Sequence, residues 1–317
     1  MIMYRFIRFF NQNRGTIIKV ILIIVFILAL IQLLNLYSKT RNSNNKNVIS
    51  DEKSNVLSEN NALVSDESLI SGGKISEKVL SQSTGLIEKF INYCIDGNVE
   101  SAYNLLTDEC KEEVFPTIED FYNIYYSSIF DGSKKNYTIE NWYGNIYRVR
   151  ITNDILSTGN LDEGNANQDY ITVVSDKINI NSYIERKEIN KTTTNSNVDI
   201  NIVSRDTYMD YEIYTISVTN NSDKTISIDS GNNPKSIYLL DEKDMKYYFY
   251  NNEMVLSNFV IPSGYKKTFK IKFANSYSSS RKIRSLVFSN FILNYDEYKE
   301  KEDGEESAYM SKINAYM

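Results

Sequence analysis

A long apolar run near the N-terminus constrains this chain more than any other feature. Residues 16–37 read TIIKVILIIVFILALIQLLNLY and contain one charged side chain, that of Lys19. A helix needs about 20 apolar residues to cross the hydrocarbon core of a membrane. Residues 1–19 carry four basic side chains and no acidic one, and an excess of Lys and Arg marks the cytoplasmic side. We therefore expect a basic cytoplasmic tail over residues 1–15, one transmembrane helix over residues 16–37, and an extracytoplasmic location for the rest of the chain.

A cleaved signal peptide is the alternative interpretation of the same run. The run is long for the apolar core of a signal peptide, and no small-x-small cleavage site follows it before the polar stretch that begins at Ser38. We therefore favour a retained single-pass anchor in the cell membrane. Cleavage near Ser38 would instead release a secreted protein.

The chain contains no histidine and only two cysteines, Cys94 and Cys110. Without histidine there is no serine-histidine or cysteine-histidine pair and no histidine ligand for a metal. Two cysteines cannot form a four-thiolate zinc or iron-sulfur site within one chain. We therefore predict no catalytic residues, no cofactor-binding residues and no metal ligands.

The distribution of charge indicates whether nucleic acid is an expected partner. Removing the four basic side chains of residues 1–19 from the 35 in the chain leaves 31 against 41 acidic ones, a net charge of −10. No basic stripe is available to phosphates beyond the first segment, so we do not expect nucleic acid as a partner. The 25 tyrosines and 3 prolines, with many Ile, Asn and Lys, are typical of AT-rich codon usage and indicate a low-GC bacterium.

Residues 38–75 are rich in Ser and Asn, carry charges of both signs and contain no aromatic residue. A segment of this composition cannot bury a hydrophobic core. We therefore expect a disordered linker between the membrane helix and the first folded domain.

Residues 76–190 combine helical and strand periodicity. Leu86, Phe90 and Cys94 repeat at helical spacing, and Asn98 can cap a second helix. A capping-box variant, TIED, follows Pro116 and opens a third helix. The inward face of that helix is predicted to comprise Phe121, Ile124, Tyr125 and Ile129. From residue 135 the period changes to two, in YTIENWY, IYRVRIT, DYITVVS and INSYIER, so the sequence predicts an α+β domain of three helices followed by an antiparallel sheet.

This domain resembles the nuclear-transport-factor-two-like superfamily of cone-shaped α+β domains. The resemblance rests on FINYCIDGNVESAYNLL, CKEEVFPTIEDF and DYITVVSDKINI, and it covers about 115 residues. It implies a curved sheet with the helices on one face. Members of the superfamily include isomerases, dehydratases and non-enzymatic binding or assembly domains, so the resemblance does not select a function.

The isomerase-like members of that superfamily use a buried carboxylate in the cone. No acidic residue here is flanked by apolar strand residues on both sides, so we interpret the available carboxylates as helix-start and strand-edge charges: Asp120, Glu140 and Asp169. Three aromatic residues could line a pocket but fit core or rim packing better: Tyr122, Tyr126 and Trp142.

The two cysteines are predicted to be buried thiols. If the first two helices form a hairpin about residues 96–98, Cys94 lies close to the turn and Cys110 well beyond it. At a rise of 1.5 Å per residue the axial gap is about 13 Å, which is longer than a disulfide tolerates.

Residues 197–295 show short alternating runs and no helical period. Seven runs are separated by turns rich in Asn, Asp, Gly and Pro: VDINIVS, YEIYTISVTN, KTISIDS, SIYLLD, KYYFYN, KKTFKIKFA and KIRSLVFSNFIL. We place the domain boundary in the polar segment KTTTNSN, residues 191–197. Residues 296–317 are expected to form a charged, solvated tail.

The second domain resembles the telokin-like, immunoglobulin-type domains of secreted bacterial proteins. The resemblance rests on ISVTNNSDKTISI, YLLDEKDMKYYFY, IPSGYKKTFKIKF and LVFSNFIL, and it implies an all-β sandwich in an extracellular setting. Alternation places Tyr248 and Tyr250 on one face of a strand, with Tyr247 and Phe249 on the other, so one pair belongs to the core. A locally basic edge is formed by Lys266, Lys267, Lys270 and Lys272, which would deter edge-to-edge aggregation.

These features favour a non-enzymatic, membrane-anchored binding or assembly protein of a bacterial cell envelope. Its expected partners are the membrane and a protein or cell-wall component outside it, and a place as an accessory subunit in a secretion or conjugation-type machine fits the same architecture by analogy. The alternative is an enzyme that uses a carboxylate in the cone on a small apolar substrate. An open pocket with a buried acid would favour the enzyme, and a filled interior would disfavour it.

Overall fold

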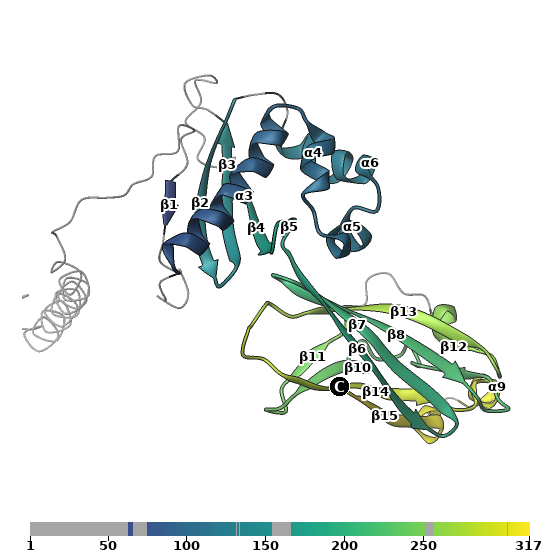
Figure 1. Cartoon of the computed structure of the whole chain (residues 1–317). Coiled ribbons are helices and arrows are strands. Elements are labelled where there is room, and N and C mark those ends of the chain that lie inside the picture. The colour runs from purple at the N-terminus through teal and green to yellow at the C-terminus, as the bar shows by residue number, and fades with distance from the viewer. Residues whose placement is uncertain are drawn as a thin grey trace, which may run out of the picture. The chain divides into compact units, whose positions relative to one another are not determined.

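The protein is described by a computed structural model over residues 63–65, 75–130, 132, 134–153, 166–250, 256–302 and 304–317. All of these residues belong to one compact unit, Leu57–Met317. The predicted transmembrane helix and cytoplasmic tail lie outside the described residues, as does most of the predicted linker. Within the described ranges, no helix combines the length and the apolar character needed to cross a membrane. The described chain is α+β, with a helical part followed by antiparallel sheets (Figure 1).

A group of helices follows β1, and the first of them begin at side chains that cap them. The first three are α3 (Glu77–Ile95), α4 (Val99–Asn104) and α5 (Asp108–Val114). Asn98 accepts a hydrogen bond from the backbone N–H of Ser101 at 3.2 Å, so the predicted cap of α4 is confirmed. The side-chain oxygens of Thr107 and Asn98 each accept a hydrogen bond from a backbone N–H group in the first turn of the helix that follows. These N–H groups have no acceptor within the helix itself.

The next predicted helix is not a regular α-helix. It runs as α6 (Ile118–Phe121), the π-helix η1 (Tyr122–Tyr126) and α7 (Ser127–Ile129). The predicted capping box at its start is confirmed, since Thr117 and Asp120 exchange both bonds. In a π-helix the hydrogen bonds join residues i and i+5, so each turn is wider than in an α-helix. Residue i+3 therefore no longer lies on the same face as residue i. Tyr125 and Ile129 are buried as predicted, but Ile124 is 55% exposed, and its predicted inward orientation is wrong.

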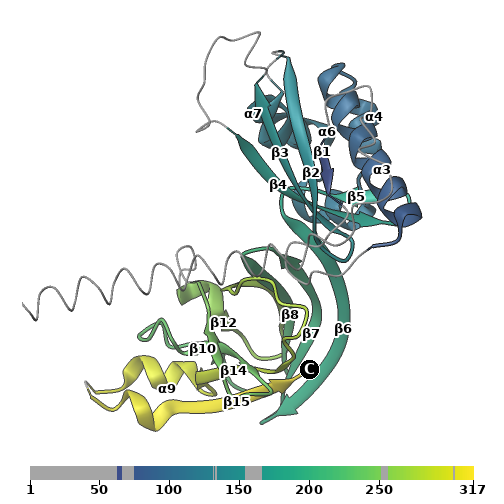
Figure 2. The same ribbon diagram turned by 90° about the vertical axis from the view of Figure 1, so that its left-hand side faces the viewer.

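A five-stranded sheet follows in the order β1-β2-β3-β4-β5. Its strands are β1 (Leu63–Ser65), β2 (Lys135–Tyr143), β3 (Ile146–Asn153), β4 (Asn167–Val174) and β5 (Lys177–Asn179). Only the β1–β2 pairing in this sheet is parallel, and β1 lies inside the segment that was predicted to be linker. Helix α3 lies against one face of the sheet, and the two elements share one hydrophobic core (Figures 1 and 2).

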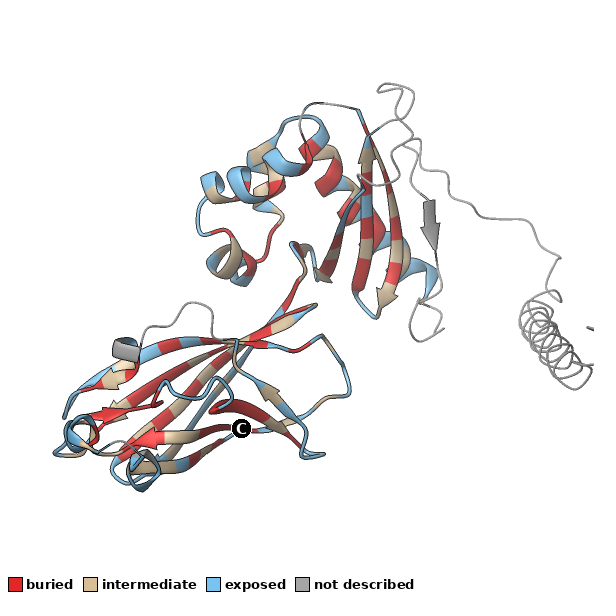
Figure 3. Cartoon of the chain, turned by 180° about the vertical axis from the view of Figure 1, so that it is seen from behind, coloured by how far each residue is buried: buried red, intermediate tan, exposed pale blue. Residues whose placement is uncertain are grey.

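The rest of the chain forms two further antiparallel sheets. The four-stranded sheet, in the order β13-β8-β7-β6, contains β6 (Tyr183–Asn195), β7 (Val198–Tyr208), β8 (Tyr211–Asn220) and β13 (Lys266–Ala274). The six-stranded sheet contains β9 (Ile226–Ser227), β10 (Ile237–Asp241), β11 (Lys246–Tyr248), β12 (Val260–Ile261), β14 (Ile283–Ile292) and β15 (Met310–Tyr316). Buried and exposed residues alternate along the long strands (Figure 3), and the buried ones of both sheets form a single core. Every one of the seven predicted runs contains a strand.

The domain limits differ from those expected from the sequence. The polar segment 191–197 is the end of β6 and the turn to β7, where Ser196 and Asn197 adopt positive φ angles of 49° and 60°. Two consecutive residues of this conformation suit a tight hairpin turn, and Asn tolerates it well. Residues 296–317 are not a solvated tail: they contribute most of α9 (Tyr295–Glu300) and all of β15, which pairs with β14 (Figure 2).

Candidate functional site

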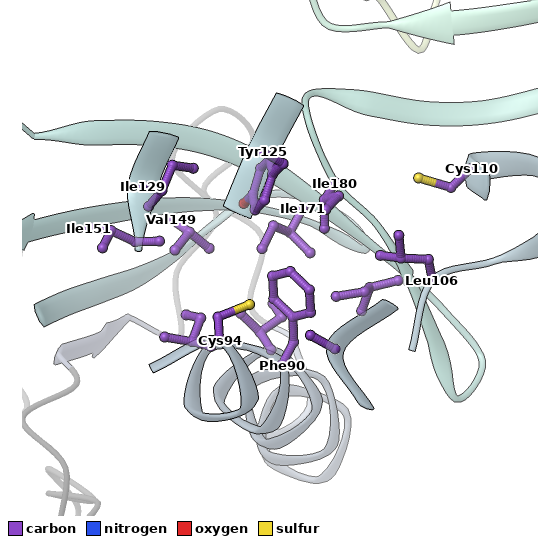
Figure 4. Close-up of a cluster of buried hydrophobic side chains, with 14 of the residues drawn as sticks. Phe90, Cys94, Leu106, Cys110, Tyr125, Ile129, Val149, Ile151, Ile171 and Ile180 are labelled. Atoms are coloured by element: carbon purple, nitrogen blue, oxygen red, sulfur yellow. The ribbon is translucent and has the colours of Figure 1, made fainter. Parts of the chain in front are cut away.

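The interior of the first domain is filled by aromatic and aliphatic side chains. Phe90, Phe115, Phe121 and Tyr125 form mutual ring contacts with centroids 5.6 to 6.3 Å apart. Figure 4 shows Phe90 and Cys94 from α3 facing Ile171, Val149 and Ile151 from the sheet. This packing fills the centre of the domain with a hydrophobic core.

Asp169 lies in this core and not at a strand edge, so its predicted position is wrong. Its carboxylate accepts four short hydrogen bonds, from the Tyr125 hydroxyl at 2.9 Å and from the backbone N–H groups of Asn181, Ser182 and Tyr170 at 2.7 to 2.8 Å, and a longer one from the Ser182 hydroxyl at 3.5 Å. Burial raises the pKa of Asp169, and these hydrogen bonds oppose the shift. Asn181 and Ser182 have positive φ angles of 58° and 59°, so the carboxylate holds the turn between β5 and β6. Oδ2 accepts two donors and Oδ1 accepts three, and this arrangement is that of a structural anchor.

The structure does not bring the other predicted carboxylates to Asp169. Asp120 closes the capping box at the start of α6, which confirms its interpretation as a helix-start charge. Glu140, on β2, accepts a hydrogen bond from Arg148 Nε at 2.7 Å across the strand pair. These three acids therefore serve three separate local structures.

The aromatic candidates of the first domain lie on its surface or rim. Tyr122 is 46% exposed and stacks on Tyr126 with ring centroids 5.3 Å apart. Trp142 contacts Tyr170 at 5.3 Å, and Arg148 lies 5.4 Å from the Trp142 ring. One stacked and one edge-on ring contact account for the positions of these side chains.

Cys94 and Cys110 are free and buried, as predicted. Burial raises the pKa of Cys110 to about 12 and raises that of Cys94 as well. A thiol is nucleophilic only as the thiolate, so neither cysteine is activated for chemistry at neutral pH.

The second domain contains a cavity of about 560 Å³ that is open to solvent. It lies where the middle of β6 approaches the loop that precedes β14. Five cationic side chains line it: Lys187, Lys191, Arg205, Arg281 and Lys282. Glu188 and Glu242 are the acidic side chains of the lining, so cations are in excess. We call this feature the basic cavity.

A buried polar network supports the wall of the basic cavity. Glu212 is 5% exposed and accepts hydrogen bonds from the Tyr214 hydroxyl at 3.2 Å and from Asn275 Nδ2 at 2.9 Å. Arg205 lies 3.8 Å from the other oxygen of Glu212. Arg281 donates to the Asn275 side chain and, at 2.6 Å, to the Ser276 carbonyl. Burial raises the pKa of Tyr214, so its hydroxyl stays protonated and remains a donor.

Sequence analysis missed this network. Its members come from β7, β8 and the segment between β13 and β14, and no local motif joins them. One signal was available: Glu212 shares the inward face of β8 with Tyr214 and Ile216, so the alternation itself places a carboxylate in the core.

The remaining candidates of the second domain lie at strand edges. Tyr248 and Tyr250 are exposed, and Tyr247 and Phe249 are partly buried against the core, so the two pairs lie on opposite faces as the alternation predicts. β13 is an edge strand, which agrees with its predicted basic edge. Three of its lysines have specific contacts: Lys270 with Glu113 at 2.8 Å, Lys272 over the Tyr211 ring at 3.6 Å, and Lys267 over the Phe269 ring at 5.7 Å.

Comparison with known proteins does not assign a family. No protein-family model matches the chain, and no curated protein matches it. Among solved structures, the chain is similar to the crystal structure of the yjhA protein from Bacillus subtilis. The two are 10% identical, the match covers 41% of this chain and 97% of that one, and the TM-score is 0.28. At that score the likeness supports no conclusion about function.

Proposed function

We propose that this chain is a membrane-anchored, non-enzymatic binding protein of a bacterial cell envelope, with its folded domains outside the cytoplasm. The observation that carries the proposal is the contrast between the two domains: the first has a filled core, and the second has an open cavity lined by five cationic side chains. A concave site with several convergent polar groups is the usual form of a ligand site.

The location is proposed from the sequence. The apolar run of residues 16–37 with four preceding basic side chains supports a single span with a cytoplasmic N-terminus. The composition supports a low-GC bacterium as the source. An accessory role in a secretion or conjugation-type machine is compatible with this architecture.

Two finer fold assignments belong to the same proposal. Helices followed by a sheet that they cover on one face support a nuclear-transport-factor-two-like first domain. Two antiparallel sheets around one core support an immunoglobulin-like sandwich for the second domain.

The alternative function is an enzyme that uses a buried carboxylate. Asp169, with its raised pKa and its contact to Tyr125, is the residue that favours it. The four short hydrogen bonds to Asp169 count against it, because they leave no oxygen free to take a proton from a substrate.

Cell fractionation combined with protease treatment of intact cells tests the proposal. We expect the full chain in the membrane fraction and its C-terminal part accessible to external protease. The matched control carries Ile24→Arg and Leu28→Arg, which place two charges in the apolar run and should remove the protein from the membrane. Recovery of the natural chain from the culture medium with a new N-terminus near Ser38 would overturn the anchor. Cross-linking and purification of the full chain that yields neither an envelope protein nor a wall polymer would overturn the binding role.

A further inference from the structure

The basic cavity concentrates positive charge in a chain whose net charge is −6. Its five cations come from three separate segments: Lys187 and Lys191 from β6, Arg205 from β7, and Arg281 and Lys282 from the loop before β14. Like charges repel, so bringing five of them to one cavity raises the energy of the empty protein. An anion that enters the cavity removes this cost.

We propose that the basic cavity binds a phosphate group carried by a small molecule, a lipid headgroup or an envelope polymer. Of the five cations, Lys191 donates to the main-chain oxygen of Met317 at 3.0 Å and Arg205 is paired with Glu212 and Glu185. This leaves an excess of three cations without a carboxylate partner within the described residues: Lys187, Arg281 and Lys282. This excess matches a phosphate, which carries about −1.5 to −2 charges as a monoester at pH 7, better than a single carboxylate. Guanidinium groups also match the geometry of phosphate oxygens with two parallel donors.

The cavity keeps donors available for such a ligand. Lys187 and Lys282 are exposed and form no ion pair within the residues that the structure describes. A ligand oxygen within reach would give these groups the partners that they lack.

The two arginines are held in position before any ligand arrives. Arg281 is fixed by Asn275 and Ser276, and its guanidinium lies 4.7 Å from the Tyr247 ring. Arg205 is held between Glu212 and Glu185, at 3.8 and 3.3 Å. A fixed donor loses less conformational entropy on binding than a free one. The volume of about 560 Å³ leaves room for the group that carries the phosphate.

This inference rests on the proposed binding role, because it names the ligand class of that same cavity. It does not use the membrane anchor or a protein partner. Absence of phosphate binding in a protein that still locates to the membrane and still captures an envelope partner would therefore overturn the inference alone.

Calorimetric titration of the purified full chain in neutral detergent tests the inference. The soluble probes are pyrophosphate and glycerol 1-phosphate, and the lipid probe is short-chain phosphatidylglycerol, with short-chain phosphatidylcholine as the zwitterionic comparison. The test variant is Lys187→Gln with Lys282→Gln. The matched control is Lys78→Gln with Lys266→Gln, which removes the same two charges at exposed positions that do not line the cavity.

We expect saturable binding by the natural chain, a loss of at least about tenfold in affinity for the test variant, and no change for the control. Tighter binding of phosphatidylglycerol than of glycerol 1-phosphate identifies a lipid headgroup as the source. Equal affinities identify a soluble or polymer-borne phosphate. No saturable binding to any phosphate probe, or an equal loss in both variants, overturns the inference, and unfolding curves measured in parallel establish that the variants are folded.

Discussion

The Nε atom of Arg186 lies 2.8 Å from Oδ1 of Asp206, a carboxylate with no exposed surface. The same guanidinium reaches Glu112 at 2.8 Å and Glu113 at 3.2 Å, both on α5. Tyr183 also donates its hydroxyl to Asp206 at 2.9 Å. One side chain on β6 therefore joins β7 of the four-stranded sheet to a helix of the first domain.

Replacing Arg186 with Gln should destabilise the protein strongly. The change leaves Asp206 buried without its cationic partner, and breaking a buried pair in this way costs about 3 to 5 kcal/mol. Chemical unfolding followed by circular dichroism measures the loss. The control is Arg284→Gln, whose partner Asp244 is exposed, and its free energy of unfolding should hardly change. Equal effects of the two substitutions would contradict a structural role for Arg186.

Replacing Asp169 with Asn should destabilise the first domain more than replacing Tyr125 with Phe. The neutral amide of Asn avoids the cost of burying a charge, which is the cost that raises the pKa of Asp169. However, the NH2 group of Asn would replace an oxygen that now accepts two hydrogen bonds, and it would point at two donors. An unsatisfied buried donor costs about 1 to 3 kcal/mol, so we expect a loss of about 2 kcal/mol or more for Asp169→Asn. Tyr125→Phe removes one of five donors and should cost about 1 kcal/mol. Urea unfolding of both variants decides the order, and an unchanged stability for Asp169→Asn would show that the carboxylate is not an anchor.

Local patterns predicted most of the secondary structure. Caps such as Asn98 and the Thr117–Asp120 box act within one turn, so three or four residues are enough to place them. Strand alternation placed Tyr247 and Tyr248 on opposite faces because the period of two is fixed by the backbone, and the structure shows that Tyr247 is the one that packs against the core. These features need no knowledge of the tertiary structure.

Features that depend on distant partners could not be predicted. The exposure of Ile124 follows from a π-helical turn, which has no clear signal in YNIYY. Asp169 is buried because a turn 12 and 13 residues later supplies two backbone donors. The five cations of the basic cavity are up to 95 positions apart, from Lys187 to Lys282, so neither its charge nor its supporting network was visible in one segment.

The stability of the protein should fall between about pH 10 and pH 12 as buried tyrosines ionise. Burial raises the pKa of Tyr137 to about 12 from the ordinary value of 10.0. Burial also raises the pKa of nine others: Tyr103, Tyr125, Tyr126, Tyr147, Tyr183, Tyr208, Tyr211, Tyr214 and Tyr277. A pKa that is higher in the folded state stabilises the fold below pH 10, and this contribution is lost as the pH rises through the folded value.

Absorbance at 295 nm, recorded with circular dichroism from pH 9 to 12.5, checks this expectation. In the folded protein a fraction of the tyrosines should stay neutral above pH 10 and then ionise together with the loss of structure. In guanidinium chloride all of them should titrate near pH 10. Complete ionisation near pH 10 in a protein that keeps its dichroism would contradict the burial of these side chains.

Replacing Ile313 with Ala should destabilise the second domain. Ile313 is 1% exposed, stands opposite Phe288 in the pairing of β15 with β14, and belongs to the core shared by the two sheets. Truncation of a buried isoleucine to alanine costs about 2 to 5 kcal/mol, whereas Lys312→Ala, at the exposed neighbouring position, should stay within about 0.5 kcal/mol. Urea unfolding gives the two values. Trypsin provides a second measurement, because pairing in β15 protects the backbone at Lys312 and Ile313→Ala should expose it to cleavage. Equal stabilities of the two variants, with rapid cleavage of the natural chain at Lys312, would contradict the pairing of β15. They would instead support the solvated tail that the charged sequence of residues 296–306 predicts.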